Sequence, residues 1–228
     1  MSPPVAIITG ASQGIGAGLV AGYRSAGYAV VGVALSLPSA EQDESDYVPV
    51  VGDVADAETA QRAVDEARDR FGRLDTLINN AGIYIGKPFT EYTFHEYEAI
   101  TAVNLTGFFH FTQLAIAEMV AGGSGHVVNV STSLVDNADS TRPSALPALT
   151  KGGLVAATRS LAIEYASRGV RVNAVSLGVI KTPDHDPRVP HGARGAPPAR
   201  ACRRSQRRRR RDPLSRASDV RNRRDAAC

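Results

Sequence analysis

The chain has 228 residues, of which 43% are hydrophobic and 21% charged, so it is long enough to bury one sizeable core. The formal net charge of +3 is uneven, because residues 1–183 carry 12 basic and 18 acidic side chains, whereas residues 184–228 carry 14 arginines and five aspartates. Both cysteines, Cys202 and Cys228, lie in the second part, which excludes a disulfide framework or a cysteine-based metal site in the first. We therefore expect one folded domain, 1–183, in a reducing cytoplasm, followed by an arginine-rich tail, 184–228.

The N-terminus has no basic segment followed by a longer apolar one, and no apolar run reaches about 18 residues. These features predict a protein that is neither exported nor inserted into a membrane. His95, His110 and His126 are scattered along the chain and form no ligand pattern. We therefore expect no metal.

Short apolar runs predict strands at 5–8, 29–35, 47–51, 76–79, 126–130 and 170–175. Apolar residues spaced by three and four predict helices at 17–26, 57–71, 94–120 and 151–168. Strands that alternate with long helices are typical of an α/β fold, a doubly wound parallel sheet that binds its ligand at the carboxyl edge of the strands.

A glycine-rich turn, TGASQGIG at 9–16, joins the first predicted strand to the first predicted helix. Gly10, Gly14 and Gly16 let the backbone turn tightly and approach a pyrophosphate, whose charge is stabilised by the free N–H groups at the helix N-terminus. A tight structural turn without a ligand would have a similar sequence. The position between strand and helix favours the cofactor interpretation.

Further motifs follow in a fixed order: GDV at 52–54, NNAG at 79–82, NLTG at 104–107, VVNVSTS at 127–133, TKGG at 150–153 and RVNAV at 171–175. In this order, from about residue 4 to residue 183, the chain resembles the short-chain dehydrogenase/reductase family. The resemblance implies a single Rossmann domain and an NAD(P)-dependent oxidoreductase that transfers a hydride between a nicotinamide and a small carbonyl or alcohol substrate. It also implies a homo-oligomer, because intact members often associate.

The resemblance implies a set of cofactor-binding residues. Asp53 and Val54 would hold the adenine, the segment 80–82 would pass beside the cofactor, and Thr182 would lie near the nicotinamide amide. An alternative for NNAG is that its asparagines tie the sheet together through hydrogen bonds. The full set is Gly10, Ser12, Gln13, Gly14, Ile15, Gly16, Ser36, Asp53, Val54, Asn80, Ala81, Gly82, Lys151 and Thr182.

In the family, a tyrosine exchanges the proton, a serine holds the substrate oxygen, and a lysine four residues after the tyrosine lowers its pKa and binds the ribose. By resemblance, Lys151 is this lysine and Asn104 belongs to the proton relay. Pro147 stands four residues before Lys151, and no tyrosine lies between Tyr97 and Tyr165. The acid of the family is therefore absent, and its loss costs about 10²- to 10⁴-fold in rate.

The serine position is better preserved, since Thr132 stands at the family's offset and Ser133 follows it. Either hydroxyl could hold a substrate oxygen, whereas Ser131 could equally satisfy backbone groups at the strand end. Pro147 also fits the start of a helix, where a missing N–H is tolerated. A non-catalytic NAD(P)-binding protein is therefore the alternative to an enzyme.

The choice between NAD and NADP depends on the end of the second strand. Ala34 and Leu35 occupy the region where NAD-binding members usually carry an aspartate for the ribose 2′-hydroxyl. Gln13 and Ser36 are neutral, so no basic residue marks a 2′-phosphate site. The absence of a repelling carboxylate, together with the Ser36 hydroxyl, slightly favours NADP.

The tail from 184 has no apolar periodicity and contains an unbroken arginine run at 207–211, so we expect it to be disordered. An arm that binds nucleic acid is one interpretation. We favour a shifted reading frame instead, because codons exist for 207–228 that read DVVDAILYLEHRTFVTGEMLHV one base out of frame, which resembles the family's usual end. The last helix and strand of the fold would then be missing.

Overall fold

The structure is a computed structural model that describes residues 2–37, 44–178 and 180. These residues belong to one compact unit. Four expectations lie outside the described residues: the role of Thr182, the state of the tail at 184–228, the shifted frame, and the absence of the last helix and strand.

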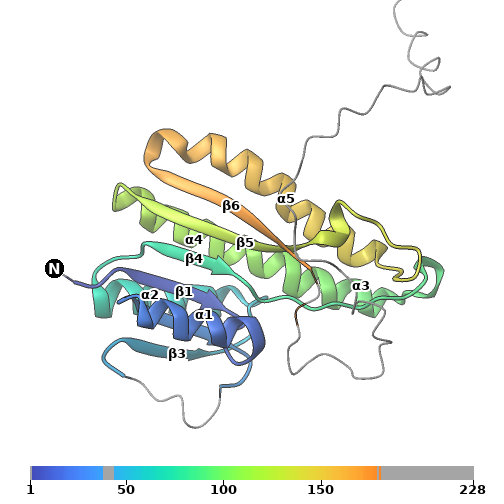
Figure 1. Ribbon diagram of the computed structural model, residues 1–228. Helices are drawn as coiled ribbons and strands as arrows, with labels where there is room; N and C mark the ends of the chain where they lie inside the picture. The colour runs from blue at the N-terminus through green and yellow to red at the C-terminus, as the bar shows by residue number, and fades with distance from the viewer. Residues whose placement is uncertain (1, 38–43, 179, 181–228) are drawn as a thin grey trace, which may run out of the picture. The chain divides into compact units, whose positions relative to one another are not determined.

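Six parallel strands form one sheet in the order β3-β2-β1-β4-β5-β6 (Figure 1). Their bounds are β1 (Val5–Thr9), β2 (Ala29–Ala34), β3 (Tyr47–Val51), β4 (Thr76–Asn79), β5 (Gly125–Thr132) and β6 (Val170–Leu177). Every residue of β1 and β2 is buried, as continuous apolar runs in a parallel sheet require. The strand order reverses between β1 and β4, and such a reversal opens a ligand crevice at the carboxyl ends of these strands.

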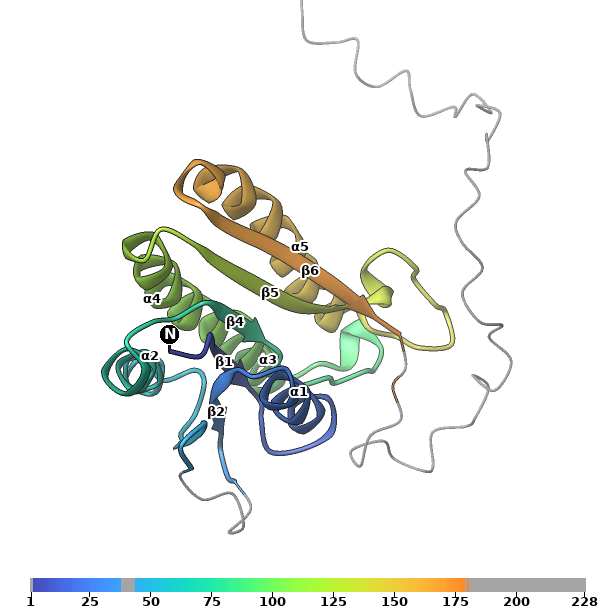
Figure 2. The same cartoon turned by 60° about the vertical axis from the view of Figure 1, so that its left-hand side comes forward.

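Helices cover the two faces of the sheet unequally. α1 (Gly14–Ser25) packs on one face, whereas α2 (Ala57–Phe71), α4 (Gly107–Ala121) and α5 (Ala145–Tyr165) contribute to the core on the other. In Figure 2, α1 and α2 lie on opposite sides of β1. This division follows from right-handed crossovers, because the chain moves one way along the sheet after β1 and the other way after β3.

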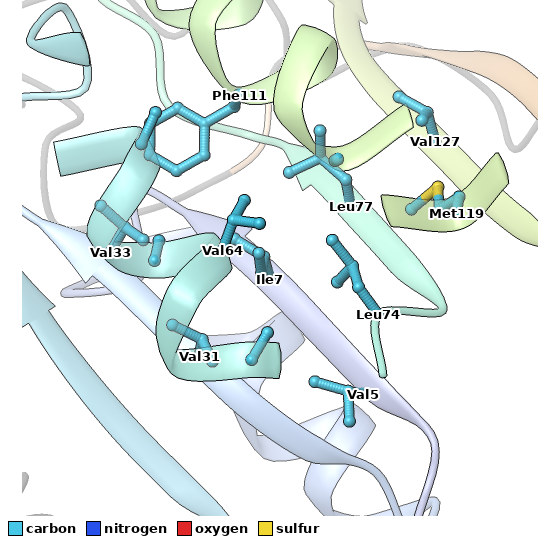
Figure 3. Packing of buried hydrophobic residues seen from close by; sticks show 14 of the residues in the cluster. Val5, Ile7, Val31, Val33, Val64, Leu74, Leu77, Phe111, Met119 and Val127 are labelled. Atoms are coloured by element: carbon cyan, nitrogen blue, oxygen red, sulfur yellow. The ribbon is translucent and has the colours of Figure 1, made fainter. Parts of the chain in front are cut away.

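The larger core lies between the sheet and α2 and α4 (Figure 3). Side chains of β1 and β2 meet Val64 of α2 and both Phe111 and Met119 of α4. Phe111 and Met119 are fully buried. This packing fixes the strand ends, and therefore the loops that follow them, relative to one another.

Short elements complete the fold: η1 (Phe89–Glu91), α3 (Phe94–Thr101), η2 (Ala102–Thr106), η3 (Ser133–Val135) and η4 (Ala166–Arg168). By length and composition alone, Phe94–Ala121 is the one helical stretch in the described part of the chain that could cross a membrane. This is weak evidence, because the core helix of a globular domain has the same composition, and Phe111, Ala115 and Met119 are buried in the core.

Two predicted helices differ in the structure. The helix expected at 94–120 is interrupted by η2, a π-helical turn, between α3 and α4. The helix expected at 151–168 begins earlier, at Ala145, so Pro147 lies inside its first turn. The first N–H groups of a helix have no intrahelical acceptor, so proline costs no hydrogen bond there. The first bond of α5 joins Ala148 N to Ser144 O at 2.8 Å, one residue after the proline.

Candidate active site

The glycine-rich turn leaves β1 and enters α1 at the carboxyl edge of the sheet. Gly10 and Gly14 have positive φ angles of 69° and 55°, which L side chains rarely adopt. A Cβ on Gly16 would overlap the Gly10 carbonyl, so only glycine at position 16 lets α1 approach the turn this closely. The amides of Gly14, Ile15 and Gly16 stand at the start of α1, where helix geometry supplies no intrahelical acceptor. Together with Ser12 and Gln13 they form a cradle suited to an anion.

The NNAG segment ties β4 to its neighbours. The Asn79 amide donates to Thr112 Oγ1 at 2.9 Å and to Asn129 Oδ1 at 2.8 Å. The Asn80 amide donates to the Thr9 carbonyl at 2.9 Å and to the Gly10 carbonyl at 3.2 Å. Both asparagines therefore have the structural role that was the alternative interpretation, and Asn80 also holds the glycine-rich turn.

Thr9, at the end of β1, closes the contact with the next loop. Its Oγ1 accepts from the backbone N–H groups of Asn80, at 3.1 Å, and Ala81, at 3.0 Å. A Cβ on Gly10 would lie only 3.0 Å from the Ala81 Cα. The predicted cofactor segments 10–16 and 80–82 are therefore in direct contact.

Asn104 lies in the π-helical turn and is 2% exposed. Its Nδ2 donates to the Ile83 carbonyl and to Thr150 Oγ1, both at 3.1 Å, and its Oδ1 accepts from the Ile83 N–H at 2.9 Å. One side chain thus joins the helix after β4, the loop after Gly82 and the first turns of α5. π-Helical turns occur often at functional sites, where they change the direction of side chains.

Lys151 projects from α5 toward the same loop. Its Nζ donates to the Val130 carbonyl at 2.9 Å, and it would lie 2.8 Å from a Cβ on Gly82. That point is also 3.1 Å from Asn104 Oδ1. Gly82 therefore lies between Lys151 and Asn104, so the structure brings these predicted site residues together. Desolvation by burial lowers the pKa of Lys151 to about 8.

The three hydroxyls after Asn129 differ in their surroundings. Ser131 is buried and donates to the Lys151 carbonyl at 3.3 Å, so it satisfies a backbone group, as the alternative interpretation held. Thr132 Oγ1 accepts from the Leu134 N–H at 3.3 Å and caps η3. Ser133 follows at the first position of η3 and is half-buried. Among the described residues no hydrogen-bond partner is found for its hydroxyl.

Pro147 occupies the position of the family's tyrosine. Pro147 is buried within the first turn of α5, and its carbonyl accepts from Thr150 Oγ1 at 3.2 Å. Thr150 in turn accepts from Asn104. Pro147 therefore belongs to the hydrogen-bonded frame of the site and supplies no titratable group.

The ends of β2 and β3 carry the residues expected to hold the adenosine. Val54 is buried and would lie 3.0 Å from a Cβ on Gly107, whereas Asp53 is exposed. Ser36 is exposed two residues after β2. Arg62 of α2 donates to the Val51 carbonyl at 3.0 Å and covers Gly52.

Sequence reasoning missed Thr9, Thr150 and Arg62. Thr9 and Thr150 stand inside the recognised motifs, so their place in TGASQGIG and TKGG was an available signal. Arg62 had no such signal, because nothing in a helical pattern reveals which side chain folds back over the preceding strand. No group of three or more His, Cys, Asp or Glu that could hold a metal ion occurs in the part of the chain that the structure describes.

Comparison with known proteins agrees with this geometry. The family model described as "short chain dehydrogenase" matches residues 4–191. D-threitol dehydrogenase of Mycolicibacterium smegmatis is 33% identical over 185 residues, covering 78% of this chain and 70% of that protein. The 3-oxoacyl-[acyl-carrier-protein] reductase FabG of Thermotoga maritima is 32% identical over 188 residues, covering 78% and 75%.

Among solved structures, gluconate 5-dehydrogenase from Burkholderia cenocepacia, in complex with NADP and tartrate, aligns with a TM-score of 0.72 and 30% identity. The alignment covers 79% of this chain and 73% of that one. The family match spans most of the described residues and includes every motif around the glycine-rich turn, Asn104 and Lys151. The chain belongs to the short-chain dehydrogenase family.

Proposed function

We propose that this chain is an NAD(P)-dependent oxidoreductase that interconverts a small carbonyl compound and the corresponding alcohol. The observation that carries this proposal is the meeting of the glycine-rich turn, the Gly82 loop, Asn104 and Lys151 at one edge of the sheet. A dinucleotide needs an anion cradle for its central pyrophosphate and hydrogen-bonding groups for its nicotinamide ribose. Both features occur within the same contact network.

The residues present fit the cofactor. A Cβ at Gly10 would press on the Ala81 backbone, and one at Gly16 would overlap the Gly10 carbonyl, so the turn needs glycine at both positions. The first amides of α1 suit a pyrophosphate. Lys151 is the candidate for the ribose hydroxyls, and Thr132 or Ser133 for the substrate oxygen. When bound, the nicotinamide supplies or accepts the hydride. The protein's own task is to orient the two reactants and to exclude water.

We infer a preference for NADP over NAD. No carboxylate stands at Ala34–Leu35 to accept a ribose 2′-hydroxyl or to repel a 2′-phosphate. The Arg62 guanidinium covers Gly52, one residue before the expected adenine contacts, and has no carboxylate partner among the described residues. Since Gly52 N bonds to the Ala34 carbonyl at 2.9 Å, this cation lies beside the end of β2, where the 2′-substituent is held in this fold. The NADP complex of the gluconate 5-dehydrogenase supports the same choice.

The alternative is a protein that binds the nucleotide without catalysis, and Pro147 is the observation that favours it. Pro147 is buried, and its side chain has no proton to give. The relatives named above act on different substrates, so we propose only the class, a small carbonyl or alcohol. We further propose a cytoplasmic homo-oligomer that acts without membrane or nucleic acid.

A cofactor titration tests the proposal. Purified full-length protein is titrated with NADPH by fluorescence, and carbonyl-dependent loss of absorbance of NADPH is followed over a panel of ketones, aldehydes and keto acids. Gly16→Ala is expected to weaken NADPH binding by tenfold or more, on the order of a lost phosphate contact. Gly18→Ala, on the same helix with open space around it, is the matched control and should bind as the parent does.

Binding with turnover supports the enzyme, and binding without turnover supports the alternative. A folded protein that binds neither NADPH nor NADH would contradict both. Circular dichroism of each variant separates loss of binding from loss of fold.

A further inference from the structure

No tyrosine lies near Lys151 on α5, but Lys151 is itself a proton donor. Tyr165, the only tyrosine of α5, is 14 residues beyond Lys151, about 21 Å along the helix axis, and the Arg168 guanidinium covers its ring at 4.1 Å. Tyr92 donates its hydroxyl to the Ile85 carbonyl at 2.6 Å. Tyr84, two residues after Gly82, is exposed, and its hydroxyl lies beside Gly86. Among the described residues, none of these three tyrosines is hydrogen-bonded to Lys151.

Lys151 has donors that the protein does not use. An ammonium carries three N–H groups, and one of them is taken by the Val130 carbonyl. Among the described residues no acceptor is found for the other two. Asn104 Oδ1, close to the same point, already accepts from Ile83. The remaining N–H groups therefore stand beside Gly82, the loop that the proposed function assigns to the cofactor.

We propose that the Lys151 ammonium is the general acid of this chain and delivers the proton, through a bound water, to the substrate oxygen. This inference rests on the proposed function. In the reduction, the hydride forms a C–H bond at the carbonyl carbon, the carbonyl π-bond breaks, and its oxygen takes one proton. The proton leaves Lys151 Nζ by way of the water, the amine becomes neutral, and bulk solvent protonates it again.

The lowered pKa of Lys151 suits a general acid. A general acid works best with a pKa near the working pH, and burial holds the pKa of Lys151 at about 8 instead of its usual value. Burial is the sole cause of that shift. The charged groups on the surrounding elements are paired elsewhere: Lys87 of the Gly82 loop with Glu96 at 2.6 Å, and Asp139 of the β5–α5 connection with Arg142 at 3.8 Å.

Asp136, at the end of η3, is the remaining charge on that connection, and it contributes nothing to the shift. β5 has His126 at its opposite end. His110 on α4 and His95 and Glu98 on α3 also leave the pKa of Lys151 unchanged. The protonation of Lys151 therefore depends on its dehydration and not on a neighbouring charge.

The rates of reduction and of oxidation should depend on pH in opposite directions. The protonated form is the acid, so reduction at saturating NADPH should be constant below about pH 8 and fall tenfold per pH unit above it. Oxidation of the alcohol needs the neutral amine as base. Its rate should rise up to about pH 8 and then level.

The decisive variant is Lys151→Arg, with Lys87→Arg as the matched control. Arginine keeps the positive charge and the donors but holds its proton too tightly to transfer it. Measured at saturating NADPH, so that a weaker ribose contact does not enter the rate, we expect Lys151→Arg to lose about 10²- to 10⁴-fold in kcat and to lose the fall in rate above about pH 8. Lys87→Arg should change none of these.

A second measurement reads Lys151 without turnover. The chain has only three lysines, Lys87, Lys151 and Lys181, so competitive acetylation followed by mass spectrometry can resolve each one. Lys151 should reach half-maximal reactivity near pH 8, whereas a lysine in a model peptide titrates at about 10.4.

Three results would overturn the assignment. Turnover in Lys151→Arg with the parental rate and pH limb would make water the acid, while leaving the proposed function intact. Acetylation of Lys151 with the pH dependence of Lys87 would remove its competence as an acid. A parent protein that binds NADPH but turns over no carbonyl would overturn the proposed function together with this inference.

Discussion

Asn104 should contribute strongly to stability, because its side chain joins the Gly82 loop to α5 through hydrogen bonds. Replacement of Asn104 by alanine removes three hydrogen bonds, to Ile83 N, Ile83 O and Thr150 Oγ1. Each such bond contributes about 0.5–1.5 kcal/mol. Because the Asn104 side chain is almost fully buried, its removal leaves the polar groups of Ile83 and Thr150 without this partner in the protein interior. We expect the free energy of unfolding to fall by about 2–4 kcal/mol.

Urea denaturation followed by circular dichroism measures this change. With a denaturant dependence of about 2 kcal/mol per molar, the midpoint should fall by about 1–2 M. The control is Asn137→Ala, because the Asn137 amide donates to the Ser133 carbonyl at 3.3 Å in an exposed position. It should cost no more than about 0.5 kcal/mol. Equal midpoints for the two variants would refute the view that Asn104 joins the Gly82 loop to α5.

The remaining predictions concern the cofactor and the acid. Ser36→Asp should weaken NADPH binding by about tenfold or more relative to NADH, because a carboxylate would repel a 2′-phosphate and accept a 2′-hydroxyl; unchanged selectivity would contradict this. Arg62→Gln should weaken NADPH binding by about tenfold and leave NADH binding unchanged, as fluorescence titration can measure; equal losses for both would assign Arg62 a purely structural role. Pro147→Tyr should raise kcat for reduction by about 10- to 100-fold, whereas Pro147→Phe, with the same ring and no hydroxyl, should not; equal rates for the two variants would argue against an added acid.

The sheet could be predicted from the sequence because apolar runs leave few alternatives. The runs at Val5–Thr9 and Ala29–Ala34 are too short for helices and are apolar at nearly every position, which suits strands buried on both faces. The glycine-rich turn could also be predicted, because the positive φ angles at positions 10 and 14 favour glycine, which the sequence has at both. The doubly wound parallel sheet is confirmed by the structure and by the family match.

The interruption near Asn104 could not be predicted, because Phe94–Ala121 has the apolar spacing of one continuous helix. The π-helical turn accompanies side-chain bonds to Ile83, 21 residues earlier, and local periodicity contains no such information. The early start of α5 was missed for a similar reason. Leu146 and Pro147 are buried, which the sequence does not show, although proline in a first helical turn was a usable signal.

The hydrogen-bond partners of Asn79 and Asn80 could not be predicted from the sequence. Asn79 and Asn80 could equally have touched a cofactor or the sheet, and only the positions of Thr112, Asn129 and Thr9 give them partners in the protein. The lowered pKa of Lys151 likewise depends on burial that no motif encodes. Sequence reasoning identified the chemical groups, and tertiary packing determined their protonation and their neighbours.

The most direct test of the account is a single-turnover experiment with the full-length protein in excess over NADPH. Bound NADPH is mixed with each member of a carbonyl panel, and its absorbance is followed at several pH values. We predict carbonyl-dependent oxidation of the cofactor with a rate that falls above about pH 8. NADPH that stays bound and fully reduced with every carbonyl would contradict the proposed oxidoreductase activity.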